Sequence, residues 1–207
     1  MRRRNRSRRP ARRVPYKDPR PVILIVTEGK VTEPGYLNGF ARATRNPRVR
    51  IKVVGGVGVP KTIVESAKEL KIEAEEEARG AKDDNLRYDE VWCVFDFDDH
   101  PNVPDAKQMA RDNGIELALS NPCIELWLWL HFADQPGMQD RHKLQSAMKK
   151  HVSGYDKHVN YSDYETGYDA AVKRASRLHE NAKADNEEGR NPTTGVWRLT
   201  ESIRSDA

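Results

Sequence analysis

Short apolar runs alternate with amphipathic segments over the first two thirds of the chain. Four runs predict strands, at residues 22–26, 51–54, 91–95 and 115–119. Apolar residues recur at helical spacing between and after these runs, at residues 34–44, 61–79, 105–113 and 122–132. Strands that are apolar on both faces are typical of parallel sheets, and their alternation with helices implies right-handed crossovers. The pattern therefore predicts the α/β class, with a Rossmann-like parallel sheet of about four strands flanked by helices.

The last third of the chain is more polar, and its pattern is helical. Amphipathic helices are expected at residues 141–152 and 165–184, followed by a short helix after Asn191-Pro192. We therefore divide the chain into three parts. They are an arm at residues 1–20, an α/β core at 21–135, and a helical extension at 136–207 that packs on the core.

The arm at residues 1–20 concentrates the positive charge. The whole chain has a net charge of +4, but the arm holds nine arginines and one lysine against one aspartate, so the rest carries −5. Such a segment cannot build a core, and we expect it to be disordered on its own. It is either a solubilising tail or a contact for nucleic acid, and the near-exclusive use of arginine favours phosphate binding. The arginines that would make this contact are Arg2, Arg3, Arg4, Arg6, Arg8, Arg9, Arg12 and Arg13.

The two cysteines and the lengths of the apolar segments predict a cytoplasmic protein that is not bound to a membrane. No apolar segment is long enough to span a bilayer, and the basic N-terminus lacks the apolar stretch of a secretory signal. Cys93 and Cys123 lie in apolar runs without a neighbouring cysteine at zinc-ligand spacing. We expect both to be core residues, and a disulfide between them stays open.

The candidate chemistry begins at the end of the third predicted strand. There the apolar run 91–95 leads into Asp96-Phe97-Asp98-Asp99-His100. In an extended strand, Asp96 and Asp98 project to one side and Phe97 to the other. Two neighbouring carboxylates repel each other unless a cation lies between them, and Mg²⁺ prefers carboxylate oxygen. Taken alone, this segment is equally well interpreted as a metal site or as a solvated acidic turn.

Other predicted strand ends carry polar residues that would meet at the same edge. Glu28 follows the first strand, and Asn121 and Glu125 follow the fourth. Ligands of α/β proteins bind at the carboxyl ends of their strands. We expect Asn121 to cap the next helix, with Pro122 in its first turn. Glu125 lies in an otherwise apolar helix, so it either requires a partner or a metal, or bonds to local backbone as a capping residue.

A glycine-rich segment at residues 55–62 does not form a nucleotide-binding loop of the G-x-x-x-x-G-K-[ST] type. Pro60 stands where that pattern needs glycine, and proline offers no N–H to a phosphate. We expect instead a flexible turn into a helix, able to approach a phosphate backbone.

Several longer segments resemble the RloB family. They are residues 27–34, 94–100, 120–132, 154–157 and 191–194, together with the arginine-rich N-terminus. A glutamate after the first strand and D-x-D after the third also resemble the Toprim fold of topoisomerases, primases and OLD-type nucleases. The resemblance covers about residues 20–207 and implies a Toprim-like core.

The resemblance implies a Mg²⁺-dependent (or Mn²⁺-dependent) endonuclease of prokaryotic antiphage defence or abortive infection. Its substrate would be DNA or RNA, with transfer RNA among the candidates, and a defence-system protein or a second copy of the chain would be a partner. The catalytic residues would be Glu28, Asp96, Asp98 and Lys157, of which the three carboxylates would bind metal. Residues supporting them would be Glu33, Asp99, Asn121 and Glu125. His100 and His131 are weaker candidates, because such histidines are more often structural.

One departure from the Toprim pattern concerns the middle of D-x-D. The basic residue often found there is Phe97 in this chain, which removes one charge but keeps both carboxylates. A second interpretation is a non-catalytic module that binds nucleic acid or a partner and has a regulatory metal site. A third, a primase or topoisomerase domain, is weak, because no strand-passage tyrosine or template-binding domain is evident.

Overall fold

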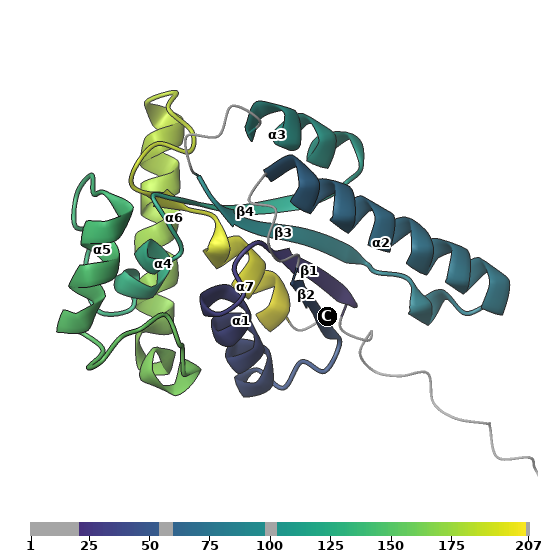
Figure 1. The fold of residues 1–207 in the computed structure, drawn as a ribbon, viewed down its shortest axis with the longest axis horizontal. Coiled ribbons are helices and arrows are strands. Elements are labelled where there is room, and N and C mark those ends of the chain that lie inside the picture. Colours follow the sequence, from purple (N-terminus) through teal and green to yellow (C-terminus); the bar gives the residue numbers. More distant parts are fainter. Residues whose placement is uncertain (1–20, 54–59, 98–102, 206–207) are drawn as a thin grey trace, which may run out of the picture.

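The computed structural model describes residues 21–53, 60–97 and 103–205. A five-stranded sheet in the order β2-β1-β3-β4-β5 lies at its centre (Figure 1). The strands are β1 (Ile23–Thr27), β2 (Val49–Val53), β3 (Glu90–Asp96), β4 (Glu116–Asn121) and β5 (Thr193–Thr194). The first four pair in parallel, and β5 pairs antiparallel with β4. The predicted α/β class and its four parallel strands are therefore confirmed, and β5 is an addition that the apolar pattern did not predict.

Helices cover both faces of the sheet. They are α1 (Thr32–Ala43), α2 (Pro60–Ala81), α3 (Val103–Asp112), α4 (Glu125–Leu130), α5 (Arg141–Ala147), α6 (Tyr168–Ala184) and α7 (Val196–Arg204). Helices α2 and α3 lie on one face, and α1 and α7 on the other (Figure 1). Short 3₁₀ turns occur at Asp84–Leu86, Met148–Lys150, Tyr161–Asp163 and Glu165–Gly167.

Alternating side chains of the buried strands supply two separate cores. Ile23 and Ile25 of β1 pack with α1, α4 and α7, whereas Leu24 and Val26 pack with α2 and α3. All of β1 is buried, as expected for a strand with neighbours on both sides and helices on both faces. Because both faces of β1 are buried, every position of the strand is apolar or small, and the sequence shows it as a continuous apolar run.

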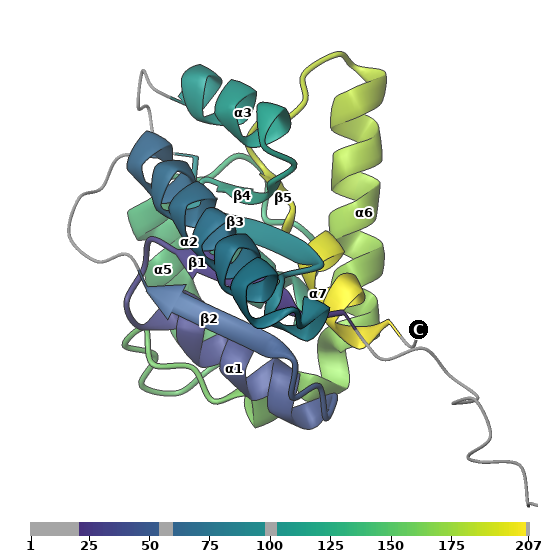
Figure 2. The same ribbon diagram turned by 90° about the vertical axis from the view of Figure 1, so that its right-hand side faces the viewer.

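The C-terminal segment is built into the sheet and the first of these cores. Strand β5 extends the sheet beyond β4, and α7 lies against β4 and beside α1 (Figure 2). Val196, Leu199 and Ile203 of α7 belong to the same hydrophobic cluster as Ile23 and Ile25. The extension predicted at 136–207 thus shares a core with the segment 21–135, and the domain boundaries themselves stay a prediction.

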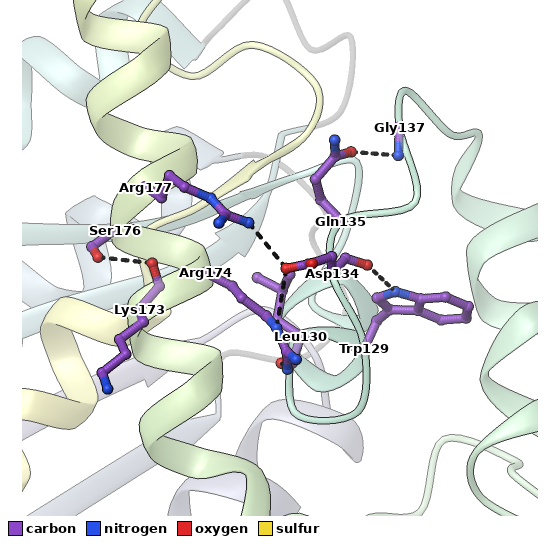
Figure 3. Close-up of polar contacts among 9 residues, drawn as sticks. All are labelled: Trp129, Leu130, Asp134, Gln135, Gly137, Lys173, Arg174, Ser176 and Arg177. Atoms are coloured by element: carbon purple, nitrogen blue, oxygen red, sulfur yellow. Dashed lines mark hydrogen bonds and ion pairs between the residues drawn. The ribbon is translucent and has the colours of Figure 1, made fainter.

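Two polar side chains of α6 join it to the segment that follows α4. Arg174 donates to the carbonyl of Leu130 at 2.6 Å and lies 3.2 Å from Asp134 Oδ1 (Figure 3). Arg177 reaches the same carboxylate oxygen at 3.0 Å, and the indole of Trp129 donates to the Asp134 carbonyl. The bond from Arg174 satisfies the carbonyl of the last residue of the short helix α4, and the other contacts hold the segment that follows it.

Two local expectations were wrong or only partly met. Asn121 does not cap a helix: β4 runs through Asn121, and α4 begins only at Glu125, preceded by Ile124 without a side-chain cap. The helix expected over 122–132 is correspondingly shorter.

Cys93 and Cys123 are both buried and free, as the core interpretation predicted. In the described part of the chain, no helix is both long and apolar enough to cross a membrane.

Candidate functional site

The parallel register brings the ends of β1 and β3 together. Thr27 pairs with Val94, and the next residue, Glu28, donates its N–H to the Val94 carbonyl at 3.1 Å. Asp96, two residues further along β3, pairs with Ser120 of β4. Parallel strands present their carboxyl ends at one edge, so Glu28 and Asp96, which are far apart in sequence, lie on neighbouring strand tips.

A cavity of about 360 Å³ opens at this edge, and we call it the carboxylate cavity. Four acidic side chains from different elements line it: Glu28, Glu33, Asp96 and Glu125. Three cationic side chains line it too: Lys30, Arg141 and Lys157. The structure therefore brings together five of the residues predicted for the site, and adds Lys30 and Arg141.

Asp96 is held from two sides. Its Oδ1 accepts the backbone N–H of Ile124 at 2.9 Å, and its Oδ2 accepts from Arg141 at 2.7 Å. Burial raises the pKa of Asp96 well above its usual range, and the nearby Glu33 raises it further, while Arg141 opposes the shift. A cation bound near Asp96 would favour the charged form of its carboxyl group and would offset part of the cost of burying it.

Glu33 is buried in the first turn of α1 and lies over Gly29. A Cβ on Gly29 would overlap the Glu33 carboxyl group, so the absence of a side chain there makes room for it. Burial raises the pKa of Glu33, and repulsion by Glu125 and Glu28 adds to the effect. The turn predicted at Gly29 thus serves to seat an acidic group.

Glu125 is the most deeply buried of the four, with 1% of its surface exposed. Its Oε1 accepts from the hydroxyl of Tyr155 at 3.1 Å, while its Oε2 has no hydrogen-bond partner among the described residues. The capping interpretation predicted a bond to local backbone, and the side chain instead bonds to a distant tyrosine. Burying a carboxylate oxygen without a hydrogen-bond donor costs free energy. This cost favours the binding of a cation in the cavity, either directly or through a water molecule.

Lys157 reaches the carboxylate cavity from a loop. Its φ is +76°, a left-handed conformation, and its carbonyl accepts from the Thr32 hydroxyl at 3.0 Å. This bond ties the loop to the start of α1, close to Glu33. The loop residue predicted from the family resemblance is therefore positioned by tertiary contacts at the same cavity as the acidic side chains.

Other predicted residues lie elsewhere or outside the described ranges. Asn121 lines a different cleft and donates its amide to the Gly189 carbonyl at 2.8 Å, so the structure does not bring it to the carboxylate cavity. Asp98, Asp99, His100 and the eight arginines predicted to bind nucleic acid lie outside the described residues.

His131 is held in an aromatic cluster. Its Nδ1 is 2.9 Å from the Trp127 carbonyl, which can only accept, so Nδ1 carries the proton. Its Nε2 then accepts from the hydroxyl of Tyr36 at 3.0 Å. Burial lowers the pKa of His131 to about 4. This neutral, fully bonded imidazole has the structural role that the sequence analysis favoured.

Arg141 is the main site residue that the sequence analysis missed. It begins α5, and in sequence it is one charged residue of an amphipathic helix. Only the fold shows that this helix starts beside the tip of β3. No local pattern marked it, because its partner Asp96 lies 45 positions earlier.

The donor set of the carboxylate cavity fits a hard divalent cation. Carboxylate oxygens are the ligands such ions prefer, and among the described residues Oε2 of Glu125 has no hydrogen-bond partner. Burial raises the pKa of Asp96 and Glu33, and a bound cation would offset this cost. Within the residues that the structure describes, no three His, Cys, Asp or Glu side chains are arranged as a ready-made metal site. Asp98, the third expected ligand, lies outside those residues.

Fold and cavity together define an α/β protein with acidic side chains gathered at the carboxyl edge of a mostly parallel sheet. The model of the family described as RloB-like protein matches residues 23–203. The chain therefore belongs to the RloB-like protein family. A search of curated proteins returned no match.

Proposed function

We propose that this protein is a metal-dependent nuclease of the Toprim and RloB type, which hydrolyses phosphodiester bonds in DNA or RNA as an effector of antiphage defence. The observation that carries the proposal is the carboxylate cavity, where four acidic side chains gather at one edge of the sheet and Oε2 of the buried Glu125 has no hydrogen-bond partner among the described residues. Membership of the RloB-like family supports it. Cytoplasmic location and a defence partner protein or second copy are parts of the same proposal.

The side chains of the cavity divide into two groups. Glu28, Asp96 and, by expectation, Asp98 would hold Mg²⁺ or Mn²⁺, which supplies the positive charge that neutralises a phosphate and activates an attacking oxygen. Lys157 and Arg141 face the same cavity and would bind non-bridging phosphate oxygens of the substrate.

Glu33 is the group best suited to proton transfer. Its raised pKa allows its carboxyl group to hold a proton nearer to neutral pH than an exposed glutamate would. Gly29 has no side chain, so it leaves space for this carboxyl group, which lines the cavity. A proton held on a Glu33 oxygen could therefore pass to the oxygen that leaves the phosphate.

The direct test compares the purified protein with its Asp96→Asn variant. Supercoiled DNA, single-stranded DNA and transfer RNA are incubated with Mg²⁺ or Mn²⁺. We expect cleavage of at least one substrate, reduced by about 100-fold or more in the variant, because a catalytic carboxylate is lost. Asp134→Asn is the matched control, since Asp134 is exposed and its side-chain contacts are with α6. Equal cleavage by wild type and Asp96→Asn would remove the assignment.

A binding module with a regulatory metal is the second candidate. It is favoured by the ion pair of Arg141 with Asp96, which already neutralises one carboxylate of the cavity. Titration calorimetry with Mn²⁺ distinguishes the two functions when combined with the cleavage assay. Metal binding without cleavage of any nucleic acid supports the module, and metal-dependent cleavage that Asp96→Asn abolishes supports the nuclease.

A further inference from the structure

A second and larger cleft lies along the outer strands of the sheet. Its volume is about 570 Å³, and we call it the β4 cleft. Its walls come from β4 and β5, from α3, from the end of α6, and from the start of α7. Helices α3 and α6 stand on either side of β4 and β5 in Figure 2. The cleft is thus formed by segments that are distant in sequence, and it is distinct from the carboxylate cavity.

Cationic side chains converge on the β4 cleft. Lys107 and Arg111 are four residues apart on α3 and so share one face of the helix. Lys183 of α6 and Arg198 of α7 approach from the other walls. Arg198 is engaged, because it donates to the Leu117 carbonyl at 2.8 Å and lies 4.0 Å from Glu116.

The other three cations carry the argument. Among the described residues, no acidic side chain forms an ion pair with Lys107, Arg111 or Lys183. Two carboxylates, Glu116 and Glu188, also line the cleft, so its net charge remains positive. The chain beyond residue 20 is acidic overall, at −5. A positive cleft on an acidic body is therefore a local feature that selects an anionic ligand.

Two further features suit the cleft to a nucleic-acid strand. The half-buried ring of Phe97 forms part of one wall, with Lys107 Nζ 5.4 Å from its centroid, so a base and a phosphate could be bound side by side. Gly189 and Gly114 present bare backbone to the cleft. Gly189 has a φ of +86°, and its carbonyl accepts from the side chain of Asn121. Because Gly189 has no side chain, a ligand in the cleft can come close to the backbone of this loop.

The position of the cleft relates it to the carboxylate cavity. Phe97 directly follows Asp96, and the alternation of the strand turns the two side chains to opposite sides. Phe97 lines the β4 cleft and Asp96 lines the carboxylate cavity, so the two sites meet at the tip of β3. We propose that the β4 cleft binds the phosphate backbone of a nucleic-acid strand and leads it to the carboxylate cavity. This inference rests on the proposed nuclease function for its biological meaning, but its test does not.

The test measures binding without cleavage. The full chain, including its arginine arm, is titrated against fluorescein-labelled single-stranded DNA, single-stranded RNA and duplex DNA in EDTA, and anisotropy is followed over a range of salt concentrations. The charge-reversal variant carries Lys107→Glu, Arg111→Glu and Lys183→Glu. The matched control carries Lys68→Glu, Arg79→Glu and Lys149→Glu, three exposed cations outside the cleft. Thermal unfolding verifies that both variants are folded.

We expect the cleft variant to bind at least one of the three nucleic acids about 10-fold more weakly or worse than the control. The plot of the logarithm of the binding constant against the logarithm of the salt concentration has a negative slope. The magnitude of this slope should be smaller by about 2–3 in the cleft variant, because each lost phosphate contact reduces it by roughly 0.7–0.9. The conservative variant Lys107→Arg, Arg111→Lys and Lys183→Arg keeps the positive charge and should bind about as tightly as the wild-type protein. Equal affinities and slopes for the cleft variant and the control overturn the inference, whether or not the protein cleaves nucleic acid. Loss of binding in the cleft variant supports it even if no cleavage is found.

Discussion

Replacement of Glu125 by glutamine tests the reasoning about the carboxylate cavity most sharply. Glu125 is 1% exposed; its Oε1 accepts from the hydroxyl of Tyr155, and its Oε2 has no hydrogen-bond partner among the residues that the structure describes. Glutamine keeps the volume of the side chain and the oxygen that accepts from Tyr155, but it removes the buried charge. It also turns the unpartnered oxygen into an amide that can donate to the neighbouring Glu33 or Asp96 carboxylate.

The magnitude follows from these contacts. A buried charge with incomplete hydrogen bonding costs several kcal/mol, and part of this cost remains in the glutamine side chain as an imperfectly bonded amide. We therefore expect Glu125→Gln to raise the free energy of unfolding of the metal-free protein by about 1–3 kcal/mol. For a chain of this size, each kcal/mol raises the Tm by about 2–4 °C.

The assay is thermal unfolding in EDTA, repeated with increasing Mn²⁺ or Mg²⁺. Wild-type protein should gain stability with metal as the ligand binds the folded state, by RT ln(1 + [L]/Kd). Glu125→Gln should begin at a higher Tm and gain less from metal. Glu165→Gln is the control, because Glu165 is exposed on the 3₁₀ turn before α6. A variant that is less stable without metal, and is stabilised by metal as much as wild type, would refute the reasoning.

Three further predictions concern neighbouring groups. Arg141→Gln removes the cation that neutralises the aspartate of β3 at 2.7 Å, so Mn²⁺ affinity measured by calorimetry should rise by about 10-fold; a lower affinity would mean that the arginine helps to build the metal site. His131 has its pKa lowered to about 4 from 6.5, so the unfolded chain takes up its proton first, and stability should be lost as pH falls from about 6.5 through 4. His131→Gln should flatten this part of the pH profile in urea unfolding, and identical profiles would contradict the assignment. Gly29→Ala places a Cβ where the carboxyl group of Glu33 lies, at the far end of a flexible side chain, so it should displace that carboxyl group and weaken metal binding at a stability cost of less than about 1 kcal/mol. The control Gly80→Ala meets no atom within 4 Å in α2 and should be neutral or stabilising.

The sequence determined the core architecture because its signals are local. A strand buried on both faces must be apolar at every position, and an amphipathic helix must repeat its apolar residues at helical spacing. For this reason the four parallel strands and their crossover helices could be predicted from the sequence. Parallel pairing then implied that Glu28 and Asp96 would lie at one edge, as the register of β1 and β3 confirms.

Tertiary structure decided the features that have no local signal. Strand β5 is two residues long and exists only because β4 offers it an edge, so no apolar run announces it. Asn121 was expected beside Glu125, but the continuation of β4 directs it to Gly189 and the β4 cleft. Arg141 reaches Asp96 because α5 begins beside the end of β3, which lies 45 residues earlier in the sequence. The local pattern records which side chains must be buried, whereas charge partners and cleft walls depend on distances that only the folded chain creates.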